Sequence, residues 1–343
     1  MRKIKVGNRW IGEGEPCFIT ADVGANHNCD FNIAKKLIDK GKEGGVDAIK
    51  FQIYSAETLY SKKVPKHSYY KEGLWNLIKQ IETPRDWIPK LREYCDKRKV
   101  MFFATPFDFG AVDKLNPYVD FYKIASFELV DLTLVEYIAK KRKPTIISTG
   151  LANMEEIEDA YLACKKAGND KIIFLQCASL YPAGPEIMNL RAMETIKAAF
   201  PDTIVGLSDH TMGIHISIAA VAMGAKVIEK HFTLSRKMKG PDHRFAMEPG
   251  ELWEMVKQIR EVESSFGDGR KLGPKPAEME NYRIARRSIH AKVRIPKETK
   301  ITKDMLVIKR PGYGIKPKFM DIIIGRKAQR DIQADEWITW DMI

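Results

Sequence analysis

Lysines inside two apolar runs are the residues of this sequence that most need an explanation. Lys50 lies in the run IKFQ and Lys123 in the run YKIAS, and burying an ammonium group without an anionic partner is strongly unfavourable. Hydroxyl residues also end apolar runs: Thr105, Ser126, Ser148, Thr149 and Ser208. Two ammonium groups beside hydroxyls and loop amides predict a cradle for a phosphate or a carboxylate. The alternative is internal salt bridges, for instance from Lys123 to Asp22 or Glu128.

Histidines end two further apolar runs. His210 closes the run GLSDH and His231 closes VIEKH, and two imidazoles at neighbouring strand ends can meet on one ion. Two imidazoles without a thiolate predict an open, exchangeable site for Mn2+ or Mg2+ rather than structural zinc. The alternative is a pair of histidines with only hydrogen-bonding roles. His27 and His215 are further candidates, and His215, in a helical pattern, is expected to be structural.

Carboxylates complete the polar set. Asp22 follows the first apolar run, Glu128 lies two residues past Ser126, and Asp242 lies with His243 in a Gly-Pro-Asp-His loop. Such carboxylates can hold sugar hydroxyls or transfer protons. For Asp242 an ordinary turn is the alternative, because Gly-Pro-Asp is also a turn sequence.

Eight short apolar runs must position these side chains, with segments of helical spacing between them: residues 17–23, 46–53, 100–105, 119–126, 144–149, 171–178, 203–210 and 225–232. Alternating strands and helices are typical of a parallel sheet. Eight such units in about 260 residues predict a (β/α)8 TIM barrel, whose active site lies at the carboxyl ends of the strands. The polar residues collect at those ends, so they are expected to form one site.

Helical patterns fill the intervals, among them residues 32–43, 154–167 and 250–266. Asn153 is expected to cap the second of these helices. Thr83 is expected to cap another helix, with Pro84 as its first residue.

A change of composition divides the chain into domains. Residues 1–266 are the predicted barrel domain, and Gly, Pro and charged residues dominate the predicted linker at 267–283. Residues 284–343 contain a repeat, in which Ala291 and Ala328, for example, occupy equivalent positions. This pattern predicts a compact β-rich domain with internal pseudo-symmetry, small enough to need support from the barrel or another subunit.

The composition excludes several classes of protein. The net charge is +12, but no basic run is interleaved with aromatic residues, so no nucleic acid partner is expected, and the charge favours anionic substrates. No apolar run has membrane-spanning length, so no membrane association and a cytoplasmic location are expected. The five cysteines show no CxxC spacing and are expected to be reduced, with Cys17 and Cys177 as core residues.

Motifs along nearly the whole chain resemble the sialic acid (nonulosonic acid) synthase family: ADVGANHN, DAIKFQ, FFATPFD, YKIAS, ISTG, QCASLYP, GLSDHTMG, EKHFT, GPDHRFAMEP, ARRSI and IKRPGYGI. The pair GLSDHTMG and AKVIEKHFT is the most specific. The resemblance implies a TIM barrel joined to a C-terminal antifreeze-like (SAF) domain. It also implies a transferase that condenses phosphoenolpyruvate with an N-acetylmannosamine-type aldose, an N-acylated amino sugar, and releases phosphate.

The resemblance also implies residue roles. Phosphoenolpyruvate would be held by Lys50, Thr105, Lys123, Ser126, Ser148 and Ser208. The acceptor sugar would be held by Gln52, Glu128, Tyr181 and Asp242. His210 and His231 would bind the divalent metal, Mn2+ or Mg2+. Arg310 would reach the site of a partner subunit in a domain-swapped homodimer. Asp22 stands where the family usually has Glu, which leaves its catalytic role open.

Alternative functions remain open at this stage. One is another phosphoenolpyruvate-condensing enzyme, a 3-deoxy-ulosonate synthase. A second is a Schiff-base aldolase using Lys50, Lys123 or Lys230, and a third is a non-catalytic glycan-binding or ice-binding protein. The acceptor could be N-acetylmannosamine, its 6-phosphate, or a 2,4-diacetamido-trideoxy hexose that leads to legionaminic or pseudaminic acid. The loop Ser55–Gly73 is expected to make that choice.

Overall fold

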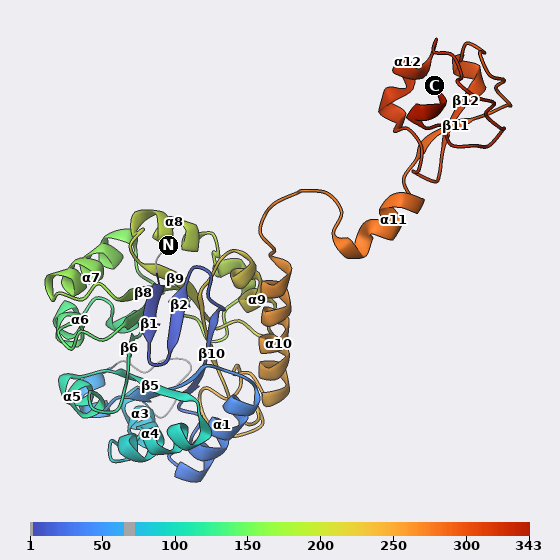
Figure 1. Cartoon of the computed structure of the whole chain (residues 1–343). Helices are drawn as coiled ribbons and strands as arrows, with labels where there is room; N and C mark the ends of the chain where they lie inside the picture. Colours follow the sequence, from blue (N-terminus) through green and yellow to red (C-terminus); the bar gives the residue numbers. More distant parts are fainter. Residues whose placement is uncertain (1–2, 65–72) are drawn as a thin grey trace. The chain divides into compact units, whose positions relative to one another are not determined.

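A computed structural model describes residues 3–64 and 73–343 in two compact units, Met1–Phe266 and Gly267–Ile343. The first unit is a closed barrel of parallel strands surrounded by helices (Figure 1). The strands follow one another around the barrel until β10 pairs with β3: β3 (Phe18–Gly24), β4 (Ala48–Ile53), β5 (Met101–Pro106), β6 (Tyr122–Ile124), β7 (Thr145–Ser148), β8 (Ile172–Cys177), β9 (Ile204–Asp209) and β10 (Val227–His231). Each strand falls on one of the eight predicted runs, and the predicted TIM barrel is confirmed.

A hairpin closes the barrel where its strands begin (Figure 1). Strands β1 (Lys3–Val6) and β2 (Arg9–Gly12) are antiparallel, and Ile4, Val6 and Ile11 are buried against the barrel interior. The barrel residues in this cluster are apolar: Phe18, Ala48, Phe103, Phe121, Ile146, Ile173, Leu175, Ile204 and Val227. Because this apolar plug fills one end, the polar interior residues are confined to the end where the strands finish.

Helices cover the outside of the barrel: α1 (Phe31–Glu43), α4 (Trp87–Arg98), α5 (Phe109–Leu115), α6 (Leu132–Ala139), α7 (Met154–Lys166), α8 (Ala192–Ala199), α9 (His215–Ala222) and α10 (Pro249–Ser265). Two shorter helices, α2 (Ala56–Leu59) and α3 (Leu74–Ile81), lie between β4 and α4. Within residues 3–64 and 73–343, no helix has both the length and the apolar character needed to cross a membrane.

One predicted helix start is confirmed and one is wrong. Asn153 caps α7 by accepting a hydrogen bond from the Glu156 N–H, and the Glu156 side chain accepts from the Asn153 N–H in return. Thr83 caps no helix, because α4 begins only at Trp87. The Thr83 hydroxyl instead lies 2.8 Å from Nε2 of the buried His27. A tertiary contact has replaced the local one that the sequence pattern indicated.

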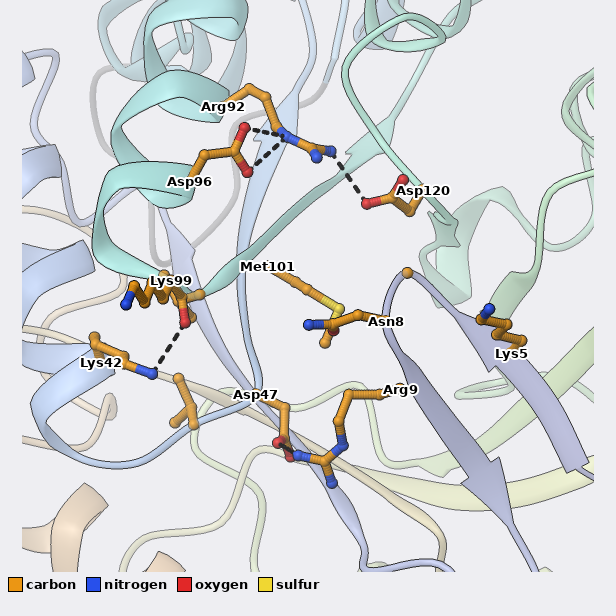
Figure 2. Close-up of a pocket in the computed structure, with 13 residues that line it drawn as sticks. Lys5, Asn8, Arg9, Lys42, Asp47, Arg92, Asp96, Lys99, Met101 and Asp120 are labelled. Carbon is orange, nitrogen blue, oxygen red and sulfur yellow. Dashed lines mark hydrogen bonds and ion pairs between the residues drawn. The ribbon is translucent and has the colours of Figure 1, made fainter.

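A cavity of about 740 Å3 opens beside the hairpin turn, at the end of the barrel where the strands begin (Figure 2). Most of its charged side chains contact one another or nearby backbone: Arg9 with Asp47, Arg92 with Asp96 and Asp120, and Lys42 with the carbonyl oxygen of Lys99. Lys42 and Lys99 lie at the carboxyl ends of α1 and α4, where cations stabilise unpaired carbonyl groups. These contacts tie the hairpin and the helices to the barrel.

The second unit has its own small core. Strands β11 (Ser288–Ala291) and β12 (Leu306–Lys309) are antiparallel, and short helices α11 (Met279–Ile284) and α12 (Met320–Ile323) flank them in the chain. Helix α11 falls largely in the segment predicted as a linker. Buried apolar side chains come from both copies of the repeat, including Ile301 and its equivalent Ile338.

Backbone hydrogen bonds show the predicted pseudo-symmetry of this unit. The Ile295 N–H donates to the Ile332 carbonyl and the Ile332 N–H donates to the Ile295 carbonyl, both at 2.9 Å. At the equivalent turns of the two copies, Glu298 and Asp335 both have positive φ, 67° and 74°. Each copy also ends in the predicted short helical turn, at Lys303–Met305 and Trp340–Met342. A pseudo-twofold axis therefore relates the two copies.

Candidate active site

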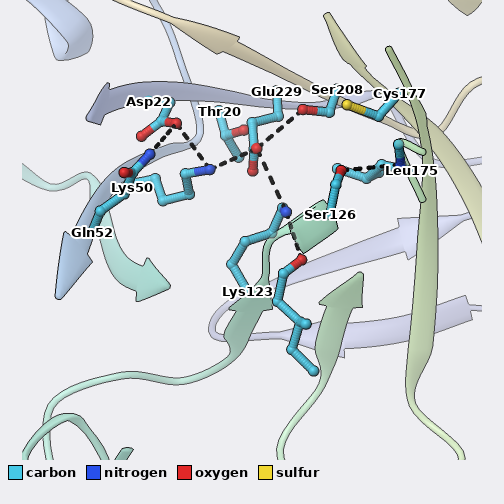
Figure 3. Close-up of polar contacts among 12 residues, drawn as sticks. Thr20, Asp22, Lys50, Gln52, Lys123, Ser126, Leu175, Cys177, Ser208 and Glu229 are labelled. Atoms are coloured by element: carbon cyan, nitrogen blue, oxygen red, sulfur yellow. Dashed lines mark hydrogen bonds and ion pairs between the residues drawn. The ribbon is translucent and has the colours of Figure 1, made fainter. Parts of the chain in front are cut away.

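A buried network of charged side chains lies inside the barrel near the ends of β3, β4 and β10 (Figure 3). The Lys50 Nζ is 2.6 Å from a carboxylate oxygen of Glu229 and 3.0 Å from one of Asp22. Gln52 donates a hydrogen bond to Asp22 at 3.1 Å. The three charged residues are each at most 4% exposed. For Lys50, then, the internal salt bridge that the sequence left open exists.

The charges of this network stabilise one another against burial. Burial lowers the pKa of Lys50, but the Asp22 and Glu229 carboxylates more than offset it and raise that pKa overall. Burial raises the pKa of Asp22, but the positive charge of Lys50 and the nearby His231 more than offset burial, so the pKa of Asp22 is lowered overall. The pKa of Glu229 is lowered in the same way, because both Lys50 and Lys123 oppose the effect of burial. All three groups are therefore expected to stay ionised near neutral pH.

Lys123, on β6, points into the same space with weaker contacts (Figure 3). Its Nζ donates to the Ile124 carbonyl oxygen at 2.8 Å and lies 3.8 Å from a carboxylate oxygen of Glu229. Among the ion pairs of the described residues, Lys123 has none with Asp22 or Glu128, so the salt bridges considered from the sequence were wrong for this lysine. Burial lowers the pKa of Lys123 to about 8. An added anion would stabilise this ammonium group.

Hydroxyl groups at the same end of the barrel lack partners. Three buried hydroxyls have no hydrogen bond within the described part of the chain: Thr105, Ser148 and Ser179. Ser126 Oγ accepts from the Gly150 N–H at 3.0 Å, and Ser208 Oγ donates to Glu229 at 3.3 Å. Buried polar groups without partners are uncommon in native proteins. A ligand with several acceptor oxygens would satisfy these hydroxyls.

Gly150 makes room for this group of side chains. A Cβ atom at this position would lie 2.3 Å from the Ser179 Oγ, 2.8 Å from the Ser126 Oγ and 3.2 Å from the Cys177 Sγ. Any side chain would therefore displace the hydroxyls. The backbone N–H of Gly150 can approach them only because the residue is glycine.

The lowered pKa of Lys123 predicts a pH dependence for binding an anionic substrate. Below about pH 8 the ammonium group is charged and attracts a phosphate, and above that pH the neutral amine does not. We expect kcat/KM for the phosphorylated substrate to fall by up to about tenfold per pH unit above this point, because kcat/KM reports the free enzyme. The kcat value stays level to higher pH, since a bound anion raises the pKa. Steady-state kinetics check this, and a kcat/KM that is level through pH 8 would contradict it.

Glu128 lies in a short 3-10 turn, Ser126–Glu128, directly after β6. Its Oε2 atom is buried without a hydrogen-bond partner among the described residues. Burial raises the pKa of Glu128 to about 7, although the positive charge of Lys123 opposes the effect. A carboxyl group with this pKa can both donate and accept a proton near neutral pH.

The two histidines lie side by side at the ends of β9 and β10, with ring centroids 5.4 Å apart. The His210 Nδ1 is 2.8 Å from the Ala178 carbonyl oxygen, so Nδ1 carries the proton and Nε2 of a neutral ring keeps its lone pair. The His231 Nε2 is 3.4 Å from Asp22, and its Nδ1 is buried without a partner in the described chain. Burial lowers the pKa of His231. Burial also lowers the pKa of His210, but the contacts of this ring with Cys177 and the Ala178 carbonyl more than offset burial and raise its pKa overall.

These two imidazoles fit a divalent metal ion as part of its coordination shell. A carbonyl that fixes the tautomer and orientation of a ligating ring is a common arrangement at metal sites, and Ala178 supplies one for His210. The Nδ1 atom of His231, which has no hydrogen-bond partner in the described chain, could donate its lone pair to the same ion. The described residues contain no group of three or more His, Cys, Asp or Glu side chains placed to hold a metal, so substrate or water would have to complete the shell.

Asp242 lies beside His231 rather than in an isolated turn. Its Oδ2 accepts a hydrogen bond from the Ala25 N–H at 3.1 Å, directly after β3. Gly24 has a φ of +52°, and a Cβ there would lie 2.7 Å from the Asp242 Oδ2 and 3.1 Å from the His231 Nδ1. The glycine therefore lets the carboxylate and the imidazole approach the end of β3 together.

Aromatic rings pack around the histidines. The Tyr181 ring lies 4.3 Å from the His210 ring and 5.9 Å from the His231 ring, measured between centroids. Phe245 contacts both Tyr181 and His231, at 5.4 and 5.1 Å. These contacts restrict the two imidazoles to a narrow range of orientations.

Other candidates lie outside this cluster. Two further histidines use both ring nitrogens in hydrogen bonds: His27 with Thr83 and the Cys29 N–H, and His243 with Thr233 and Asn28. Arg310 directly follows β12 in the second unit, and its approach to a partner's site stays a prediction. In the loop Ser55–Gly73, residues 65–72 lie outside the described residues.

Glu229, Ser179 and Cys177 were missed as site residues by the sequence reasoning. Glu229 contacts both lysines, and its position two residues before His231 on a strand was a signal that the two share a face. Cys177 was expected as a core residue, but its Sγ lies 3.7 Å from the His210 Nδ1. Burial raises the pKa of the Cys177 thiol, and His210 more than offsets that effect and lowers it.

A model of the NeuB family matches residues 37–271, and a model of the SAF domain matches residues 286–343. The chain belongs to the NeuB family. Its N,N'-diacetyllegionaminic acid synthase relative from Campylobacter jejuni is 40% identical, over 93% of this chain and 98% of that protein. The human N-acetylneuraminate-9-phosphate synthase is 36% identical, over 98% of this chain and 95% of that protein.

Solved structures agree with this assignment. The crystal structure of N-acetylneuraminic acid (sialic acid) synthetase from Leptospira borgpetersenii, in complex with citrate, is 36% identical to this NeuB chain. It superposes with a TM-score of 0.75 and covers 82% of this chain and 95% of that one. The predicted family and the C-terminal SAF domain are confirmed.

Proposed function

We propose that this NeuB-family chain condenses phosphoenolpyruvate with an N-acetylmannosamine-type aldose to give a nine-carbon nonulosonic acid and phosphate. One observation carries the proposal: two buried lysines lie at the same end of the barrel as hydroxyl groups that have no hydrogen-bond partner among residues 3–64 and 73–343. Relatives named for N,N'-diacetyllegionaminic acid and N-acetylneuraminate 9-phosphate support the same class of product. The chemistry of the site and the family therefore point to the same reaction.

Phosphoenolpyruvate has the oxygens that this end of the barrel could bind. Its phosphate and carboxylate oxygens would accept hydrogen bonds from Lys123 and from the hydroxyl groups that face the interior: Thr105, Ser126, Ser148 and Ser208. Lys50 already has two carboxylate partners, at 2.6 and 3.0 Å, so it would contribute charge while remaining paired. Hydrogen bonds from charged donors to phosphate are among the stronger polar contacts in proteins.

The acceptor sugar would lie toward the histidines. Gln52, Glu128, Tyr181 and Asp242 would hold its hydroxyl and N-acyl groups, and His210 and His231 would hold a divalent metal, Mn2+ or Mg2+. A bound divalent ion would make the sugar aldehyde more electrophilic. Asp22 contacts Lys50, Gln52 and His231, so it would fix the relative positions of the two substrate regions.

The proposed condensation proceeds in a short sequence of bond changes. Carbon 3 of the enol pyruvate attacks the aldehyde carbon, which forms the carbon–carbon bond, breaks the carbonyl π bond and leaves positive charge at carbon 2. The alkoxide formed from the aldehyde oxygen is balanced by the proton that water loses in the next step. Water adds at carbon 2, and the tetrahedral intermediate expels phosphate by breaking the carbon–oxygen bond. Glu128, whose pKa is about 7, would accept the proton that the water loses. Lys123 and the hydroxyls would hold the departing phosphate.

The geometry weighs against a Schiff-base mechanism at Lys230. This lysine faces away from the barrel interior and pairs with Asp209 at 2.9 Å. A Schiff-base lysine must reach the substrate as a neutral amine. Lys50 is held as an ammonium group by its two carboxylates. Lys123, with a pKa of about 8, is the one lysine of the three that such a mechanism could still use.

The proposal includes a domain-swapped homodimer in the cytoplasm. Arg310 of one SAF domain would contact the N-acyl group of the sugar bound by the partner subunit. The five cysteines all have free thiols, which suits a reducing compartment. Sedimentation of the purified protein gives its oligomeric state alongside the activity measurements.

Phosphate release tests the proposed function. The protein would be incubated with phosphoenolpyruvate and Mn2+, against N-acetylmannosamine, its 6-phosphate and 2,4-diacetamido-trideoxy hexoses, each with and without a chelator. We expect release that depends on one of these sugars and is lost with the chelator. The productive sugar names the acceptor, which distinguishes a sialic acid synthase from a legionaminic or pseudaminic acid synthase.

Two outcomes would overturn the proposal. Release with a phosphorylated aldose that lacks an N-acyl group, and with none of the panel, would indicate another 3-deoxy-ulosonate synthase. A protein–substrate adduct trapped by borohydride, with turnover that resists the chelator, would indicate the aldolase mechanism at Lys123.

A further inference from the structure

A buried ion pair lies on the outer side of β9 and β10, beside the two histidines in the chain. The Lys230 Nζ is 2.9 Å from the Asp209 Oδ2, and the two residues are partners in the strand register. Because side chains alternate along a strand, Asp209 and Lys230 face the helices while His210 and His231 face the interior. Lys230 is 2% exposed and Asp209 is fully buried.

Both members of the pair make further hydrogen bonds. Asp209 accepts from the N–H and the hydroxyl of Thr211, both at 2.8 Å, and from the Ser217 hydroxyl of α9 at 2.7 Å. Lys230 donates to the Thr211 carbonyl oxygen at 2.6 Å. The carboxylate of the residue before His210 therefore binds both the residue after His210 and the residue before His231.

Stability alone does not account for a charged pair at this position. Apart from Thr211 and Ser217, the buried side chains of these strands and of α9 on this side belong to the apolar core, among them Leu207, Ala220, Val221 and Ile228. Replacing a buried ion pair with well-packed apolar residues is often neutral or stabilising, because the desolvation of the charges is costly. Charged hydrogen bonds differ from apolar contacts in holding their partners at fixed distances and angles. Here they fix the backbone next to both histidines, because Asp209, Thr211 and Lys230 are the neighbours of His210 and His231 in the chain.

We propose that Asp209 and Lys230 are positioning residues that set the spacing and orientation of His210 and His231 for one divalent ion. The proposal rests on the metal site of the proposed function. It assigns to the outer layer of the barrel a role in metal affinity. Outer partners of metal ligands typically change metal affinity by about 10- to 100-fold when replaced.

Mn2+ binding measured without turnover tests this role. The double variant Asp209→Asn with Lys230→Met removes both charges together, so neither is left buried and unpaired. We expect its Mn2+ dissociation constant, from the electron paramagnetic resonance signal of free Mn2+, to rise about 10- to 100-fold. Phosphoenolpyruvate binding in the presence of a chelator changes less than about twofold, because Ser208 is the one member of the proposed cradle on β9 or β10 and its side chain faces the interior, away from the ion pair. Raising the Mn2+ concentration restores most of kcat.

A milder variant and a matched control keep the test decisive. Ser217→Ala removes one hydrogen bond to Asp209 and is expected to weaken Mn2+ binding about two- to fivefold even if the double variant does not fold. Asp47→Asn breaks a partly buried ion-pair cluster with Arg9 and Arg260 at the opposite end of the barrel and leaves Mn2+ affinity unchanged.

The outcomes separate the two proposals. If the wild type binds Mn2+ and Ser217→Ala and the double variant bind it equally well, the positioning role is wrong and the proposed function stands. If Asp47→Asn lost as much Mn2+ affinity as the double variant, the loss would reflect a general loosening of the barrel, and the positioning role would again be wrong. A wild type that binds no Mn2+ overturns the metal site and this inference together.

Discussion

Replacing either His210 or His231 with alanine is expected to abolish metal-dependent phosphate release, with a loss of at least about 1,000-fold in kcat. Each substitution removes an imidazole from a pair whose rings lie 5.4 Å apart, so one ion would keep at most half of the nitrogen ligands proposed here. The fold should survive, because each variant loses the packing of one ring at the edge of a large core, and the unpaired Ala178 carbonyl in the His210 variant adds about 1–3 kcal/mol. Activity and thermal unfolding measured on the same samples check both parts.

His215→Ala is the matched control for these variants. His215 begins α9 and is exposed, so its replacement leaves activity and Mn2+ affinity unchanged. Phosphoenolpyruvate binding with a chelator present is expected to survive in all three variants. Full activity in either the His210 or the His231 variant would show that the metal site is misassigned.

Lys123→Met is expected to raise KM for phosphoenolpyruvate by about 10- to 150-fold, with a smaller effect on KM for the sugar. Methionine keeps the length and the apolar contacts of the side chain but removes the charge. A hydrogen bond between charged partners contributes about 1.5–3 kcal/mol, which corresponds to that range of affinity. The variant also loses the fall in kcat/KM above about pH 8, because the titrating group is gone.

Lys143→Met provides the comparison for Lys123→Met. Lys143 is a half-buried lysine, and it donates to the carbonyl oxygens of Asn116 and Val119 rather than facing the barrel interior. Its replacement lowers stability and leaves KM unchanged. A KM for phosphoenolpyruvate in Lys123→Met within about threefold of the wild type would remove Lys123 from the phosphate site.

The barrel was predictable because its signal is repeated. Each of the eight runs is buried on both faces, so it is apolar along its length and short, and the helical patterns between the runs leave few other topologies. The start of α4 was not predictable in the same way. Thr83 has the side chain of a helix cap, and only the tertiary approach of His27 gives it another partner.

The candidate site was predictable in its members but not in their pairing. The alternation of side chains along a strand brings Lys50, Lys123 and His231 to the barrel interior. Their positions near the carboxyl ends of their strands place them at the same end of the barrel. Which carboxylate meets which lysine depends on barrel closure, since β10 pairs with β3 across more than two hundred residues of sequence. Glu229 therefore lies against Lys50, although the sequence places it beside His231 alone.

The reciprocal hydrogen bonds of the second unit make it, in effect, a dimer within one chain. The bonds between Ile295 and Ile332 belong to neither copy alone, and each copy supplies backbone partners that the other requires. A half-length chain carrying one copy could build the same domain only by associating with a second molecule, as in an isologous twofold interface. Opening one copy removes the partners of the other, so the amide protons of equivalent positions exchange together with solvent, in a single cooperative event.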